Sequence, residues 1–343
     1  MRSKRLASLA CAGLIAGCVF AISAAAASAA TLQGAGSTLV APIEAEWAAS
    51  WENATGNTVN YAPVGSGSGE KDIAGGLVDF GASDAPLSVY QGVPANLVQI
   101  PWALTATGVS YHINGLRLPR HTNFHLTGSV LAKIYLGQIT NWDSPQIKSL
   151  NKGATIPSTP ITTFVRSDAS GDTYAFTRYL SDVSGAFLSQ VGSSTTVSFP
   201  KGVGEKGNSG MATALAGANG GIAYIAVSYL IAQHLPAIGI KNAGGRYVVP
   251  NLSAIEAAAS VVKHVPTGNQ VTIVNPPKRA KSAYPISTFT YAIVPTNAPQ
   301  GALLKSFFDY AIGGGQSFGP SLDFAPLPKV VLAAARGTIN GIG

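Results

Sequence analysis

The chain has 343 residues, of which 46% are hydrophobic, and it carries a formal net charge of +7. Its Lys and Arg residues are scattered rather than gathered into a basic stripe, which argues against nucleic acid as a partner. Both cysteines, Cys11 and Cys18, precede residue 30. The remaining chain therefore has no disulfide framework, thiol nucleophile or cysteine-based metal site, and its length favours two lobes over a single core.

Residues 1–30 have the pattern of an export signal. Three cations within the first five residues are followed by a long apolar run and then by an Ala-rich stretch. We expect cleavage near Ala29 or Ala30, and hence an exported protein that is periplasmic or at the cell surface. Two alternatives stay open: a retained membrane anchor, and a lipid on Cys18, which ends a sequence similar to a bacterial lipobox.

The first part of the exported chain alternates strand and helix patterns. Strands are expected at 31–33, 58–64 and 78–82, and helices at 42–53 and 70–76. A strand–helix–strand–helix–strand order predicts a parallel sheet with helices outside it. Trp47 and Trp51 lie one helical turn apart and are expected to pack in the core.

Three loops follow these strands, at Gly34–Thr38, Gly65–Gly69 and Ser83–Asp84. In open α/β sheets a ligand lies beyond the carboxyl ends of the strands, so the three loops should converge on one edge. The Gly-Ser segment 65–69 is compatible with a flexible turn, but its place between a strand and a helix favours an anion-binding loop.

Later segments repeat this alternation. Strands are expected at 109–113, 161–165, 221–225 and 286–294, and helices at 127–136, 172–180, 227–233 and 301–312. Phe307 and Phe308 should face the core from the last of these helices. The extended runs 104–113 and 286–294 are candidates for hinge strands between two lobes.

Two segments far apart in the chain, 78–87 and 166–173, look suited to the same small oxyanion. In the second, Arg166 precedes a Ser-Gly turn at a helix start, where unpaired N–H groups and the helix dipole attract an anion. In the first, Asp84 would be satisfied beside an anion only if that anion carries a proton. Phosphate carries one near neutral pH and sulfate does not.

Six motifs occur in chain order: Gly34–Pro42, Val78–Leu87, Ile134–Trp142, Arg166–Gly171, Lys206–Met211 and Tyr284–Ile286. Over nearly the whole exported chain this combination resembles the extracytoplasmic phosphate-binding proteins of Pst-type ABC transporters. The resemblance implies an α/β, two-lobed type II periplasmic-binding-protein fold, in which each lobe is a mostly parallel sheet flanked by helices and two strands form the hinge. We expect lobe 1 to comprise 31–108 and 287–343, and lobe 2 to comprise 109–286.

The same resemblance implies a function. The protein would capture inorganic phosphate in the interlobe cleft and deliver it to ABC-transporter permease subunits, as a monomer, without enzymatic activity, metal or other cofactor. Carried over position by position, the phosphate contacts fall on Thr38, Leu39, Ser66, Asp84, Arg166, Ser170, Gly171 and Asp172. Asp168 is expected either to orient Arg166 or to serve as a turn or N-cap residue.

Two positions depart from the family pattern. Leu39 stands where the family commonly has Phe, and Asp172 stands where it has Thr. A carboxylate a few ångströms from a divalent anion is repelled by several kcal/mol at an effective dielectric constant of about 20. Three interpretations stay open for Asp172: it caps the helix with its side chain turned away, it accepts a second proton from the ligand, or the site has drifted.

Other classes of function are less well supported. Neither a Gly-Lys-[Ser/Thr] P-loop nor a His-Glu-x-x-His motif occurs. The alternatives that remain are a secreted phosphatase-like protein, with a metal held by Asp84, Asp168 and Asp172, and a scaffold or adhesin that uses the fold without a ligand. The first would hydrolyse a phosphomonoester, and the second would show no thermal shift with phosphate.

Overall fold

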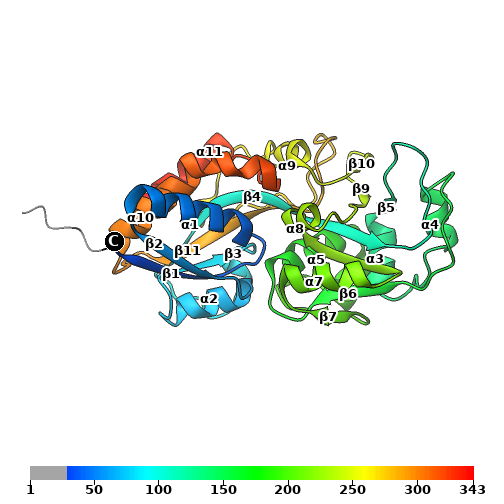
Figure 1. Cartoon of the computed structure of the whole chain (residues 1–343), viewed down its shortest axis with the longest axis horizontal. Coiled ribbons are helices and arrows are strands. Elements are labelled where there is room, and N and C mark those ends of the chain that lie inside the picture. The colour runs from blue at the N-terminus through cyan, green and yellow to red at the C-terminus, as the bar shows by residue number, and fades with distance from the viewer. Residues whose placement is uncertain (1–28) are drawn as a thin grey trace, which may run out of the picture.

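The computed structural model describes residues 29–343 (Figure 1). The predicted export signal up to residue 28, including Cys18, lies outside the described residues. The strands are β1 (Thr31–Gly36), β2 (Thr58–Ala62), β3 (Phe80–Ser83), β4 (Leu97–His112), β5 (His125–Thr127), β6 (Thr162–Arg166), β7 (Val203–Glu205), β8 (Gly221–Ala226), β9 (Gly239–Lys241), β10 (Tyr247–Val248) and β11 (Ser287–Pro295).

The α-helices alternate with these strands along most of the chain. They are α1 (Ala41–Thr55), α2 (Ser66–Ala74), α3 (Gly128–Tyr135), α4 (Pro145–Leu150), α5 (Gly171–Val183), α6 (Gly185–Gln190), α7 (Gly207–Gly217), α8 (Val227–Ala232), α9 (Leu252–Ala259), α10 (Gly301–Ile312) and α11 (Lys329–Asn340). Three short 3-10 helices are η1 (Leu87–Val89), η2 (Thr267–Asn269) and η3 (Gly314–Leu322).

Eight strands form one continuous sheet in the order β2-β1-β3-β11-β4-β8-β6-β7. At one end β1 runs parallel to β2 and β3, and at the other β6 runs parallel to β7 and β8. In the middle β11 is antiparallel to β3 and β4, and β4 is antiparallel to β8. Figure 1 shows the two parallel groups at opposite ends of an elongated molecule, with helices packed against each. The α/β fold class predicted from the sequence is confirmed.

Strand β4 links the two groups because it changes partners along its length. It pairs with β11 up to Ala106 and with β8 from Thr107 onward. The Thr107 N–H donates to Ile286 O (3.0 Å), one residue before β11 begins. The exchange of partners therefore lies beside the lobe boundaries expected from the sequence.

Asn269, in the segment assigned to lobe 2, donates to Gln99 O and Thr338 Oγ1, so η2 packs on the other group of strands.

Aromatic side chains fill the core beside β3. Phe80 lies 5.9 Å from Trp102 and 5.6 Å from Phe308, measured between ring centroids, and Trp47 lies 5.2 Å from Trp102. As predicted, Trp47, Trp51, Phe307 and Phe308 are buried. Large aromatic rings contribute most of the apolar area in such a core, so this cluster fixes the positions of β3 and α1. Candidate site residues lie just after β3 and just before α1.

Three differences from the expected elements bear on the site. Helices α4, α6, α9 and α11 and strands β5, β7, β9 and β10 were also not predicted. The Gly-Ser segment 65–69 is no loop, since α2 begins at Ser66 and uses Gly65 as its N-cap, with φ at 101°. Strand β4 is 16 residues long rather than the shorter run expected. Helix α7 was missed because three glycines lower its intrinsic propensity, and packing against β6 and β8 outweighs that cost.

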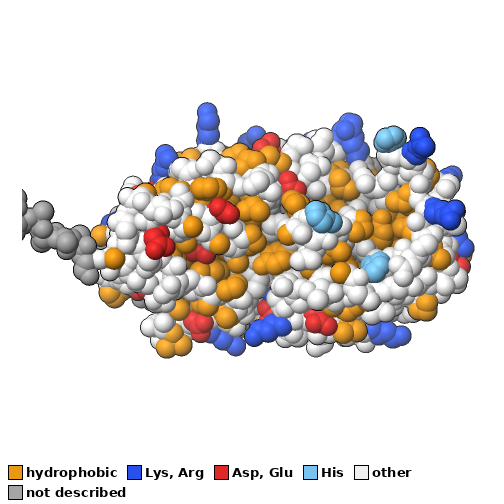
Figure 2. All heavy atoms as spheres, in the orientation of Figure 1, with side chains coloured by type: hydrophobic (Ala, Val, Ile, Leu, Met, Phe, Trp, Pro, Cys, Tyr) orange, Lys and Arg blue, Asp and Glu red, His pale blue; other side chains and the backbone are white. Residues whose placement is uncertain are grey.

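The surface has no concentration of positive charge on the face drawn in Figure 2, where Lys and Arg lie mainly around the rim. Apolar side chains are spread over both halves of this face. Within residues 29–343, no helix is both long enough and apolar enough to cross a bilayer.

Candidate functional site

The ends of the parallel strands β1, β2 and β3 converge, as the sequence predicted. Ser37, just past β1, donates its backbone N–H to Ala82 O at 2.9 Å, and Gly65, past β2, donates to Gly36 O at 2.8 Å. Each loop thus borders the next along one edge of the sheet. This edge carries Thr38, Ser66 and Asp84.

Asp84 is the acceptor at the centre of this edge and is only 2% exposed. The Ser37 hydroxyl donates to both carboxylate oxygens, at 2.6 and 2.7 Å, and the Ser66 hydroxyl lies 3.2 Å from Oδ2. Ser37 Oγ in turn accepts from the N–H groups of Leu39 and Val40. The orientation of the carboxylate is therefore fixed by two serines, of which Ser37 is itself anchored to the residues just before α1.

Arg166 reaches the same place from the other group of strands, at the end of β6. Its backbone N–H donates to the Tyr224 hydroxyl at 2.9 Å, and its side chain is 1% exposed. The guanidinium donates to Asp168 through Nε (2.7 Å) and Nη2 (2.5 Å), and to Asp172 Oδ2 through Nη1 (3.1 Å). Asp168 also accepts from the Gly207 N–H at 3.0 Å. Its carboxylate thus contacts both Arg166 and the start of α7.

The start of α5 contacts the Asp84 edge directly. Ser170 is the N-cap of α5, and its hydroxyl accepts from the N–H groups of Asp172 and Thr173. The Gly171 N–H donates to Ser66 Oγ at 3.1 Å, which is a hydrogen bond between the two groups of strands. A Cβ atom at position 171 would overlap the Asp84 side chain, so this close approach requires glycine.

Asp172 does not act as the helix cap, because Ser170 already fills that role. Its carboxylate is buried and accepts from three side chains: Thr107 at 2.7 Å, Asn208 at 2.7 Å and Arg166 at 3.1 Å. The interpretation that this side chain turns away from the site is therefore wrong.

Thr38 and Leu39 contribute in different ways. The Thr38 hydroxyl accepts from Asn208 Nδ2 at 2.9 Å, which joins α7 to the loop after β1. The Leu39 side chain is fully buried in the hydrophobic core, and its backbone N–H donates to Ser37 Oγ at 3.0 Å. Since only the backbone of Leu39 takes part in the polar network, the exchange of Phe for Leu at this position leaves the network unchanged.

The carboxyl groups titrate over different ranges. Burial, and secondly the charge of Asp172, raises the pKa of Asp84 to about 7, against the opposing hydrogen bonds of Ser37 and Ser66. Burial also raises the pKa of Asp172, although Arg166 opposes the shift. Burial alone would raise the pKa of Asp168, but the hydrogen bonds and charge of Arg166 outweigh it and lower that pKa.

Three residues of the network were missed by the sequence analysis: Ser37, Thr107 and Asn208. Ser37 and Asn208 lie inside motifs noted there, within 34–42 and 206–211, and Thr107 lies on an expected hinge strand. The signal for Asn208 was a polar side chain that follows Gly207 at a helix start. Nothing local indicated that Thr107 faces Asp172.

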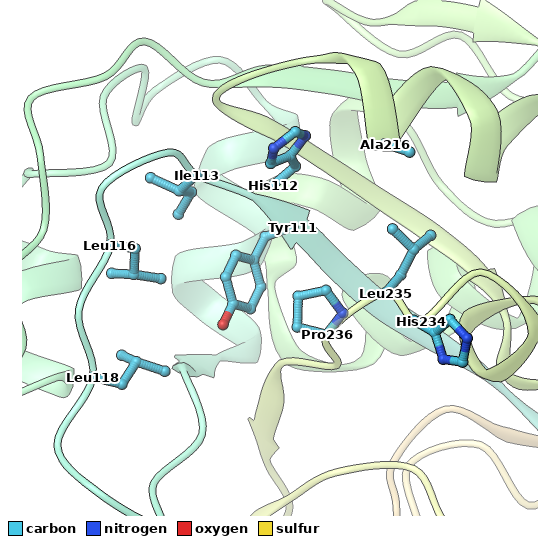
Figure 3. A pocket seen from close by; sticks show the side chains of 9 residues that line it. All are labelled: Tyr111, His112, Ile113, Leu116, Leu118, Ala216, His234, Leu235 and Pro236. Atoms are coloured by element: carbon cyan, nitrogen blue, oxygen red, sulfur yellow. The ribbon is translucent and has the colours of Figure 1, made fainter.

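Two other features of the structure lie outside this network. A cavity of about 530 Å³ is lined by Tyr111, Leu116, Leu118, Leu235 and other mostly apolar residues (Figure 3). Its lining includes no Lys or Arg, so it does not suit an oxyanion. Residues 315–319 match the pattern Gly-x-Ser-x-Gly, but they lie in η3, where the Ser317 hydroxyl donates to Gly314 O, and not on the strand-to-helix turn of a hydrolase.

No group of three or more His, Cys, Asp or Glu side chains is arranged to hold a metal ion in the part of the chain that the structure describes. The carboxylates of Asp168 and Asp172 instead share the guanidinium of Arg166.

Two sets of strands that enclose an arginine, a buried carboxyl and a helix N-terminus define a two-lobed solute-binding protein. A family model of the PBP superfamily domain matches residues 21–314. The phosphate-binding protein PstS of Pasteurella multocida is 34% identical over 308 residues, which cover 88% of each chain. The chain therefore belongs to the PstS family of phosphate-binding proteins within the PBP superfamily.

Solved structures show the same fold. The high-affinity periplasmic phosphate-binding protein PfluDING, solved with phosphate bound, aligns with a TM-score of 0.69 at 22% identity, over 91% of this chain and 99% of that one. A phosphate ABC transporter substrate-binding protein from Clostridium perfringens, also with bound phosphate, aligns with a TM-score of 0.62 at 18% identity, over 87% and 100%.

Proposed function

We propose that this protein captures inorganic phosphate between its two lobes and delivers it to the permease of an ABC transporter. The observation that carries the proposal is the enclosure of Asp84 and Arg166, from opposite groups of strands, in one buried polar network. Membership of the PstS family supports the same ligand. The protein acts by binding alone, without enzymatic activity.

Each predicted contact residue has a role that its geometry supports. Three of the five N–H donors of Arg166 are engaged by Asp168 and Asp172, which leaves two for phosphate oxygens. On binding, phosphate replaces the present hydrogen-bond partners of several groups. These groups are the hydroxyls of Thr38, Ser66 and Ser170 and the N–H groups near Leu39 and Gly171. Asp84 accepts the phosphate proton, and Asp168 orients Arg166.

The location and partners of the protein follow from the same assignment. The chain is exported, with a signal peptide cleaved near Ala29 or Ala30, and lipid attachment at Cys18 is the alternative to a free periplasmic form. It works as a monomer with two lobes that close on the ligand as other periplasmic binding proteins do. One lobe comprises 31–108 and 287–343, and the other comprises 109–286 without the segment around η2. Its binding partners are phosphate and the permease, not nucleic acid.

Calorimetric titration of the purified exported chain at a pH above the pKa of Asp84 tests this proposal. Phosphate should bind and sulfate should not, because only phosphate can donate a proton to Asp84. Sulfate binding as strong as phosphate binding would contradict the assignment. An assay with a generic phosphomonoester and divalent metals should show no hydrolysis, which separates this function from a phosphatase.

Closure of the lobes should depend on the glycine at position 67. The Gly67 N–H donates to Ala169 O at 3.0 Å, and a Cβ at position 67 would overlap the Ala169 methyl group across the cleft. We expect Gly67→Ala to weaken phosphate binding by about tenfold or more, since each 1.4 kcal/mol of strain costs a factor of ten.

The matched control is Gly337→Ala on α11. A Cβ at position 337 has nothing within 4 Å. This substitution should leave affinity unchanged and raise stability by about 0.5–1 kcal/mol, since alanine favours a helix. Titration and thermal unfolding of both variants provide the comparison, and unchanged affinity in Gly67→Ala would show that the closed contact is not required.

A further inference from the structure

Asp172 is a second buried carboxyl that lies beside the proposed phosphate site. A carboxylate offers about four acceptor positions, and Thr107, Asn208 and Arg166 occupy three of them. Oδ1 accepts only from Thr107 among the described residues. One acceptor position therefore stays available on the oxygen that Arg166 does not contact.

The charges around the site do not balance when all groups are ionised. Among the residues that the structure describes, Arg166 is the one cation whose charge acts on Asp84 and Asp172, and it is also paired with Asp168. Glu44 acts on Tyr61 and Glu70 on Tyr90. The groups whose charges interact directly with Asp84 or Asp172 are Arg166 and Asp168 near β6, Tyr224 on β8, Tyr229 on α8, and, around Asp84, Tyr61 and Tyr90. This set includes neither a lysine nor a histidine.

A phosphate dianion would therefore enter a site that already has an excess of negative charge. Like charges a few ångströms apart in a buried site repel strongly, and the usual outcome is that one of them binds a proton. Dihydrogen phosphate avoids this repulsion, because it has one negative charge and two P–OH donors. Asp84 and the free position on Asp172 Oδ1 supply an acceptor for each.

We infer that Asp172 makes phosphate capture proton-coupled, so that the ligand is held as dihydrogen phosphate with one proton shared with Asp84 and the other with Asp172. The inference rests on the proposed phosphate-binding function. The upward shift in the pKa of both carboxyls, caused first by burial, agrees with it. Asp172 is thus a residue that selects the protonation state of the ligand.

The test is calorimetric titration with inorganic phosphate at several pH values above the second ionisation of free phosphate, in buffers of different ionisation enthalpy. The full exported chain is compared with Asp172→Thr, which restores the family residue, and with Asp172→Asn, which keeps the size of the side chain. The native protein should take up about one proton per phosphate, and its affinity should fall about tenfold per pH unit. Both variants should take up about one proton fewer and show a nearly flat profile.

The control is Asp182→Asn, on the same helix, where the native carboxylate pairs with the exposed Arg178. This variant should keep the steep profile of the native protein. Parallel profiles and equal proton uptake in the native protein and both position-172 variants would overturn the inference while leaving phosphate binding intact. Absence of proton uptake in the native protein would overturn it without any variant. If the native protein binds no phosphate at any pH, the proposed function itself fails.

Discussion

Replacing Arg166 with alanine should remove most of the affinity for phosphate. The guanidinium is buried and retains two N–H donors for the ligand, so its contact with an oxyanion is charge-assisted and shielded from water. Loss of one partner of such a buried charged contact costs about 2–5 kcal/mol. We therefore expect Arg166→Ala to weaken binding by roughly 30-fold to several thousand-fold in a calorimetric titration.

The same substitution should also lower stability, because Asp168 and Asp172 lose the cation between them. Removing one partner of a buried ion pair costs about 3–5 kcal/mol, so binding must be measured well below the unfolding temperature of the variant. Arg166→Lys keeps the charge but not the planar fork, and it should recover stability better than affinity.

The matched control for Arg166 is Arg178→Ala on α5. The Arg178 side chain is 45% exposed and pairs with Asp182 at the surface. A surface pair of this kind contributes little, so affinity and stability should stay within a few tenths of a kcal/mol of the native values. If both alanine variants lost phosphate binding equally, Arg166 would not be the anion clamp.

The sequence predicted the parts of the site that are encoded locally. Asp84 follows a buried strand, Arg166 ends one, and Ser170 precedes a helical pattern. Each of these features is visible within about ten residues of chain, and in the structure all three side chains are buried. Parallel strands then bring such loops to one edge without further information.

The direction of the Asp172 side chain could not be predicted in this way. Its partners Thr107 and Asn208 are 65 and 36 residues away in sequence, and they reach it only after β4 and α7 have packed around α5. A local rule suggested a helix cap, since Asp is favoured near helix starts. Long-range hydrogen bonds outweighed that preference. The Gly-Ser segment 65–69 shows the same limit, because its glycines disfavour a helix and α2 forms through packing against β1 and β3.

Replacing Asp84 with asparagine should weaken the preference for phosphate over sulfate. In the native protein the carboxylate can only accept, and a site built to receive a proton rejects an analogue without one by up to about 10⁴–10⁵-fold. The Ser37 hydroxyl already accepts from the N–H groups of Leu39 and Val40, so its own proton must go to residue 84. In Asp84→Asn the amide oxygen keeps that hydrogen bond, and the amide nitrogen becomes a donor that faces the ligand.

The Asp84→Asn substitution should change the affinities for the two anions in opposite directions. Phosphate loses the acceptor for its P–OH group, whereas sulfate gains a donor and escapes repulsion by a buried negative charge. The ratio of phosphate to sulfate affinity should fall by at least about a hundredfold, or about 2.8 kcal/mol, when both anions are titrated at a pH above the pKa of Asp84. Asp79→Asn is the control in the same segment, because Asp79 accepts from the Gln33 N–H outside the network. If Asp84→Asn rejects sulfate as strongly as the native protein does, the acceptor at Asp84 does not set the selectivity. Charge repulsion elsewhere in the cleft would then be its cause.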